Sequence, residues 1–151
     1  MRRIAVLILI STLVPIAGAQ VRPLSNTDLC QRADRVVVGG VNKLESRWEG
    51  NKIVTDVTIM PTENLKGSGV GPFVVTIPGG TVGAVTLRAS EAPRFTVGET
   101  VVLFLKPGSS PCDVYGWHKG KYTIVNGTVR ELVNTSWAQF RQSLVDIIEN
   151  L

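Results

Sequence analysis

The C-terminal end of the chain carries apolar residues at steps of three and four positions. These residues are Trp137, Phe140, Leu144, Ile147, Ile148 and Leu151. Such spacing places the side chains on one face of an α-helix, and the hydroxyl of Thr135 or Ser136 can cap the first turn. We therefore predict an amphipathic helix over about 135–150 that packs on the rest of the domain. A partner-binding helix is the alternative.

The middle of the chain is dominated by runs of β-branched and aromatic residues, which are typical of strands. The runs cover residues 35–48, 53–59, 73–77 and 100–105, and then 115–117 and 121–125 on either side of a turn at 118–120. The turn signal at 49–52 joins the first two runs into a long hairpin, in which Gly39 and Gly40 favour a bulge. Run 100–105 is apolar at successive positions, which predicts a strand covered on both faces.

Two further segments complete the predicted fold. Ser25 or Asn26 can cap a helix over about 27–33, whereas residues 81–99 show no regular pattern and predict a long irregular loop. Five strands, a short N-terminal helix and the C-terminal amphipathic helix predict a mainly β fold, namely a five-stranded OB-fold-like barrel. Closure of a barrel removes exposed strand edges. An open β-sandwich is the alternative fold.

The first residues have the three parts of a secretory signal peptide. Arg2 and Arg3 precede a mostly apolar run over 4–17, and the small residues 17–19 form a cleavage site. A membrane-spanning helix is the alternative, but it needs about 20 apolar residues, and this run is shorter and contains Pro15. We predict a signal peptide over 1–19, cleavage after Ala19, and a single secreted or periplasmic domain over 20–151 with no stable membrane anchor.

The charge of the chain argues against a nucleic-acid partner. The formal net charge is +4, and it falls to +2 for the predicted mature domain, because the leader holds Arg2 and Arg3 and no acidic residue. Nucleic-acid binding relies on clustered Lys and Arg, and the chain has no basic run. We therefore expect no nucleic-acid partner, although single-stranded nucleic acids are common ligands of OB-type barrels.

The two cysteines, Cys30 and Cys112, are predicted to form a disulfide, because an exported chain meets an oxidising compartment. A bridge that closes so long a loop stabilises a domain by about 4–5 kcal/mol in chain-entropy terms. Two separate buried thiols are the alternative. A metal site is not expected, since His118 is the single histidine and no CxxC or HxxxH spacing occurs.

No sequence feature indicates catalysis or a cofactor. Catalysis by a Ser-His-Asp triad needs an oriented histidine, and His118 lies in a Trp-His-Lys-Gly turn. GxSxG, P-loop and GxGxxG motifs do not occur in a suitable context. We expect a protein that is not an enzyme and that needs no cofactor.

Five residues are candidates for contacts with a partner. Arg88 and Arg94 lie in the long loop, and Trp117, His118 and Lys119 lie in a glycine-flanked turn. Loops carry much of the function of small β domains, and aromatic and arginine side chains make strong binding anchors. The alternatives are that the two arginines are ordinary solvated charges, that His118 is an exposed turn residue and that Trp117 belongs to the core.

Several segments resemble the netrin-like (NTR) domain, the OB-type barrel of tissue inhibitors of metalloproteinases, netrins and complement proteins. They are "ADRVVVGGV" after Cys30, "ENLKG", "FVVTIPGG", "RFTVGETVVLFL" and "GKYTIVNGTV", and together they span roughly 29–129. The chain is also similar to exported bacterial proteins of this design, some of which resemble neighbours or partners of secreted metalloproteases. The resemblance implies the barrel and the Cys30–Cys112 disulfide.

The inhibitory mechanism of that family is not implied. The inhibitors chelate zinc through the free amine of an N-terminal cysteine, whereas Cys30 follows the predicted cleavage site by ten residues, and Arg32 replaces the second cysteine of their Cys-x-Cys motif. We expect an exported, non-catalytic binding module that acts on or with a secreted protease, and the resemblance implies a metalloprotease. The alternatives are a structural envelope protein without a small ligand and an OB-type binder of single-stranded nucleic acid.

Overall fold

The computed structural model describes residues 24–106 and 113–151, so the predicted signal peptide and Cys112 lie outside the described residues. The elements follow the predicted order closely. They are α1 (Asn26–Arg32), β1 (Arg35–Glu49), β2 (Lys52–Lys66), β3 (Phe73–Pro78), β4 (Gly80–Val82), β5 (Val85–Leu87), β6 (Thr100–Leu105), the 3-10 helix η1 (Trp117–Gly120), β7 (Lys121–Val125), β8 (Thr128–Val129) and α2 (Trp137–Glu149).

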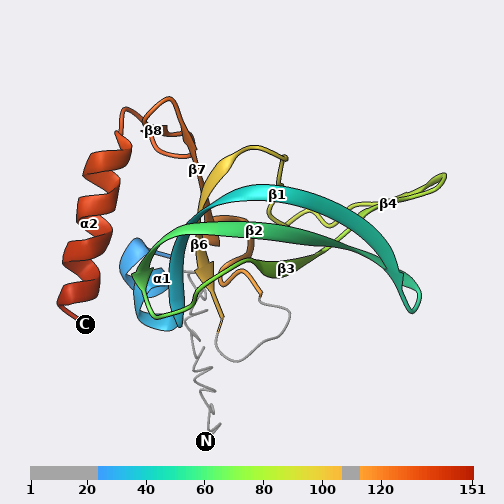
Figure 1. The fold of residues 1–151 in the computed structure, drawn as a ribbon, viewed down its shortest axis with the longest axis horizontal. Helices are drawn as coiled ribbons and strands as arrows, with labels where there is room; N and C mark the ends of the chain where they lie inside the picture. The colour runs from blue at the N-terminus through green and yellow to red at the C-terminus, as the bar shows by residue number, and fades with distance from the viewer. Residues whose placement is uncertain (1–23, 107–112) are drawn as a thin grey trace, which may run out of the picture.

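The long β1–β2 hairpin forms the centre of the fold. Within the described residues, six antiparallel strands form one sheet in the order β3-β2-β1-β6-β7-β8. The hairpin arches away from the helices, and the β4–β5 hairpin lies near its far end (Figure 1). The pairing of β1 with β2 shifts register between Val38 and Gly39. A Cβ on Gly39 would lie 2.7 Å from the Met60 carbonyl oxygen. The predicted bulge is therefore confirmed, and the close approach of Met60 requires glycine at position 39.

The mainly β prediction is confirmed, but the predicted closure into a barrel is wrong. No ladder joins β3 to β8 among the described strands, and these two strands form the edges of an open sheet. The outer edge of β7 is already paired with β8 through Ile124 and Val129, so β3 cannot bond there. The alternative β-sandwich is not found either, because the second sheet of the described chain is the two-stranded β4–β5 hairpin.

Side chains of the central strands are buried on both faces, as predicted for 100–105. Val102 and Phe104 of β6 face α1 and α2, whereas Val101 and Leu103 face the concave side, where β2 and β3 contribute valine and isoleucine. The C-terminal stripe packs on the sheet through α2, whose Phe140 and Leu144 are fully buried. Both helices begin with a serine capping box, at Ser25 and Ser136.

The "LKG" segment has a structural role. Lys66 Nζ donates hydrogen bonds to the carbonyl oxygens of Cys30 at 2.6 Å and Ala33 at 2.8 Å, so it binds the C-terminal end of α1. Burial raises the pKa of the Cys30 thiol to about 11, an effect that the Lys66 ammonium partly opposes. Cys30 has no disulfide partner among the described residues. Since Cys112 lies outside them, the predicted bridge stays a prediction.

Candidate functional site

The turn that carries three of the predicted contact residues is held by glycines. Tyr115 N donates to the Phe104 carbonyl at 2.7 Å, which anchors the turn to β6. A Cβ at Gly120 would overlap the Tyr115 carbonyl oxygen, and one at Gly116 would lie 2.8 Å from Leu24 Cδ2. The chain therefore closes tightly between Tyr115 and Gly120, and the residues between them project outward.

Trp117 lies at the outer end of this turn in an unusual backbone conformation. Its φ of +56° follows a φ of +77° at Gly116, and such a left-handed conformation is rare for a bulky residue. The residue is 49% exposed, so burial does not explain why tryptophan occupies this position. The prediction that 115–117 belongs to a strand is wrong, because Trp117 begins η1 instead.

The long loop that follows β5 contacts this turn. Glu91 accepts a backbone hydrogen bond from His118 N at 3.2 Å, and its carboxylate lies 3.1 Å from His118 Nδ1. Ala92 N donates to the Ala89 carbonyl at 3.3 Å, which gives the loop a compact bend. Two segments that are far apart in the sequence are thus joined by main-chain as well as side-chain contacts.

Two adjoining cavities flank the long loop, the first between the loop and the turn and the second between the loop and the strands that precede it, and together we call them the loop groove. The first has a volume of about 650 Å³ and is lined by Arg88, Glu91, Trp117, His118 and Lys119, among others. The second has a volume of about 420 Å³ and is lined by Arg88 and Arg94 together with residues of β1, β2 and β4. Arg88 and Ala89 line both cavities. All five predicted contact residues therefore line one or other of the two cavities: Trp117, His118 and Lys119 line the first, Arg94 lines the second, and Arg88 lines both.

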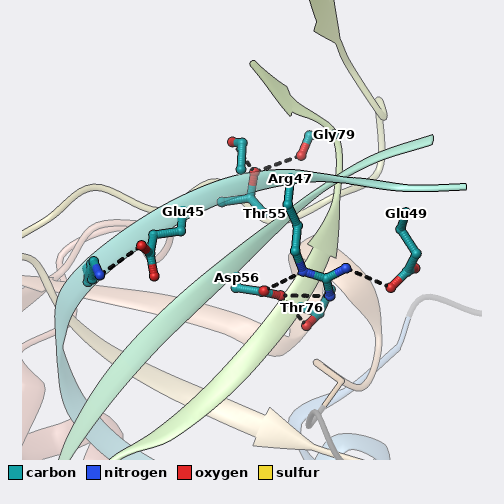
Figure 2. Close-up of polar contacts among 9 residues, drawn as sticks. Glu45, Arg47, Glu49, Thr55, Asp56, Thr76 and Gly79 are labelled. Atoms are coloured by element: carbon teal, nitrogen blue, oxygen red, sulfur yellow. Dashed lines mark hydrogen bonds and ion pairs between the residues drawn. The ribbon is translucent and has the colours of Figure 1, made fainter. Parts of the chain in front are cut away.

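A chain of hydrogen bonds fixes the floor of the second cavity. Thr55 Oγ1 donates to the Gly79 carbonyl at 2.7 Å and lies 2.9 Å from Ser46 Oγ. Because the Thr55 proton is used, Ser46 must be the donor in that contact, and Ser46 Oγ in turn accepts from Thr81 N at 3.3 Å. Figure 2 shows Thr55 directed at Gly79. Gly80 is required here, since a Cβ would overlap both hydroxyl groups.

The opposite face of the β1–β2 hairpin carries a separate ion-pair network. Arg47 Nε donates to Asp56 Oδ2 at 2.7 Å, Thr76 Oγ1 donates to Asp56 Oδ1 at 2.7 Å, and Arg47 also pairs with Glu49 (Figure 2). The hydrogen bond from Arg47 lowers the pKa of Asp56, and the bond from Thr76 adds to this. The carboxylate therefore stays ionised near neutral pH, which suits a structural pair better than a general acid.

A buried ion pair fixes the far end of the loop. Lys121 Nζ lies 2.8 Å from Glu99 Oε1, with only 8% and 9% of the two side chains exposed. Glu99 Oε1 also accepts from Thr96 N at 3.0 Å, and Lys121 lies over the Phe95 ring. Lys121 directly follows η1, so this pair ties the loop with Arg88 and Arg94 to the turn with Trp117. Nothing in the sequence pattern predicts this pair.

The groove has more basic than acidic side chains. Arg88, Arg94 and Lys119 line it, whereas Glu91 is the one carboxylate among the described lining residues. Neither Arg88 nor Arg94 forms an ion pair with any described residue. The two guanidinium groups are therefore available to a ligand.

Across residues 24–106 and 113–151, no group of three or more His, Cys, Asp and Glu side chains could hold a metal ion. Within the same ranges, no helix is long and apolar enough to cross a membrane. No protein-family model matches the chain.

Proposed function

We propose that the protein is a non-catalytic binding module that holds a protein partner in the loop groove. One observation carries the proposal: Arg88, Trp117, His118 and Lys119 come from two separate loops and line one cavity. Concave pockets with apolar lining and a few convergent polar groups are the usual ligand sites, and aromatic and arginine side chains are the usual anchors of protein–protein contacts. Each of the two loops is held in place by backbone hydrogen bonds, so the surface is formed before a partner arrives.

The conformation of Trp117 supports this function. A left-handed backbone costs a non-glycine residue about 1–3 kcal/mol, and such costs persist mainly at functional sites. Glycine would adopt the same conformation without this cost. Tryptophan is also among the residues that contribute most to protein–protein binding. A half-exposed tryptophan in a strained turn is therefore best explained by contact with a partner.

The proposal includes an exported location and a secreted protease as the first partner to test. The signal-peptide pattern over 1–19 and the motifs shared with the NTR domain support these two points. The order β3-β2-β1-β6-β7 also supports a relation to OB-type barrels, although the sheet is open. Binding through the groove would differ from amine–zinc chelation, because Cys30 does not line the groove.

Replacing Trp117 by glycine is expected to separate binding from stability. Relief of the left-handed strain, about 1–2 kcal/mol, offsets the lost packing and the greater entropy of glycine in the unfolded chain. We expect the free energy of unfolding to change by less than about 1 kcal/mol and partner binding to weaken at least about tenfold. Urea denaturation measures the first quantity, and co-purification with the tagged protein from the extracytoplasmic fraction measures the second.

Trp48 provides the matched control, because it is 47% exposed but lies on the hairpin and away from the groove. Trp48→Gly should destabilise the strand by about 1 kcal/mol and leave binding unchanged. Equal recovery of partners by wild-type protein and the Trp117→Gly variant would contradict the proposal. A structural envelope protein, the alternative, would show no defined partner that depends on position 117.

A further inference from the structure

We propose that the ligand of the loop groove is an acidic segment of a protein, whose carboxylates pair with Arg88 and Arg94 while an apolar side chain lies against Trp117. This inference rests on the proposed function and specifies its partner by chemical class. It is drawn from the charges, the hydrogen bonds and the shape of the groove.

The charges that line the groove are complementary to an acidic ligand. Arg88, Arg94 and Lys119 face a single lining carboxylate, Glu91, which already lies 3.1 Å from His118 Nδ1. An acidic ligand would pair with the two guanidinium groups, which have no ion-pair partner among the described residues. Arginine binds a carboxylate through two parallel hydrogen bonds, which makes it well suited to Asp and Glu side chains.

Apolar side chains line both cavities beside these charges. Leu24, Ala89 and Trp117 line the first cavity, and Leu44, Ile77 and Phe95 line the second. Cavities of about 650 and 420 Å³ have room for side chains. Arg88 lines both, so a ligand that bridges the cavities passes this guanidinium. A segment that carries both acidic and apolar side chains matches this mixed lining of arginine and apolar residues.

Other polyanions that a basic groove could bind match this one less well. Single-stranded nucleic acid needs several free aromatic rings for stacking, but the described lining has two aromatic rings, Trp117 in the first cavity and Phe95 in the second, and Lys121 lies over the Phe95 ring. The hydroxyl groups of an acidic polysaccharide need donors as well as acceptors. The hydroxyl protons of Ser46 and Thr55 are already donated, to Thr55 and to the Gly79 carbonyl. A protein segment fits the groove better than either polymer.

The test is a selection from a display library of random peptides on the immobilised full-length protein. Wild-type protein should enrich peptides that carry Asp or Glu beside an apolar residue, and the double variant Arg88→Gln/Arg94→Gln should not. An enriched peptide should bind this variant at least about tenfold more weakly in fluorescence anisotropy, and its binding to wild-type protein should weaken with salt. The control Arg32→Gln/Lys52→Gln removes the same charge from exposed positions outside the groove and should bind normally.

Three results would overturn the inference. The first is a failure to enrich any peptide, and the second is enrichment without acidic residues. The third is tighter binding of a thymidine oligonucleotide or of polyuronate than of the best peptide, with the same dependence on the two arginines. Failure of the proposed function is distinguishable: if Trp117→Gly loses the natural partner but Arg88→Gln/Arg94→Gln retains it, the binding function stands and the acidic ligand does not.

Discussion

Replacement of Lys121 by methionine is expected to lower the free energy of unfolding by about 3–5 kcal/mol. The side chain is 8% exposed and lies 2.8 Å from the equally buried Glu99 carboxylate. Methionine fills a similar volume but leaves that carboxylate without its close cation, and a buried unpaired charge is costly. Arg130, 4.0 Å from Glu99, is too exposed to compensate fully. Urea denaturation followed by circular dichroism measures the change.

Lys43 offers a matched control, because its Nζ also lies 2.8 Å from a carboxylate, that of Glu45, but the two side chains are 58% and 61% exposed. Lys43→Met should cost no more than about 1 kcal/mol, since surface pairs contribute little. Glu99→Gln in the Lys121→Met background should recover much of the lost stability, because the amide oxygen can still accept from Thr96 N. Equal losses in the free energy of unfolding for Lys43→Met and Lys121→Met would show that burial does not make the Lys121–Glu99 pair more important than a surface pair.

Replacement of Phe140 by alanine should lower the free energy of unfolding by about 3–5 kcal/mol. Phe140 is 2% exposed and packs against the Tyr122 ring at a centroid distance of 4.7 Å. Truncation would leave a cavity between α2 and the sheet and remove this aromatic contact. Phe140→Leu keeps most of the volume and should cost less than about 1.5 kcal/mol. Urea denaturation of wild-type protein, Phe140→Leu and Phe140→Ala measures these losses, which should lower the midpoint and leave the m-value unchanged.

Glu149 is exposed on the same helix, so Glu149→Ala should change stability by less than about 0.5 kcal/mol. Phe140 belongs to the apolar stripe of the sequence and Glu149 does not, so the sequence alone predicts the larger loss of stability for Phe140→Ala. A loss for Phe140→Ala no larger than that for Glu149→Ala would mean that α2 does not pack on the sheet in solution. It would also revive the alternative that the helix serves a partner.

Local signals predict much of the fold. Serine caps and a three- and four-residue apolar repeat define α2, and glycine at position 39 marks the bulge in β1. The β4–β5 hairpin was missed, because its strands have three residues each and its turn at Gly83 is short. Closure of the sheet was predicted wrongly because it depends on which strand occupies the outer edge of β7. That pairing is set by the turn at Asn126 and Gly127, which folds β8 back onto β7.

The sequence predicts the five candidate contact residues individually but not how they are arranged around the loop groove. Exposed-looking Trp and Arg in glycine-flanked loops are visible in the sequence, whereas their convergence on one groove depends on long-range contacts such as that of His118 with Glu91. The buried Glu99–Lys121 pair was missed for the same reason, since each residue alone resembles an ordinary surface charge. The period-two pattern of β7 predicts the reverse of what is found: Tyr122 and Ile124 form its apolar face, yet Lys121 and Thr123 are the more buried side chains.

Site-specific photocrosslinking tests the central claim most directly. The photoreactive residue benzoylphenylalanine would replace Trp117 in one variant and Trp48 in another, and both proteins would be expressed in the source organism and irradiated. The two positions are similarly exposed, at 49% and 47%. We predict a defined crosslinked partner at position 117 and none at position 48. The same products at both positions, or none at position 117, would contradict the assignment of the loop groove as a binding site.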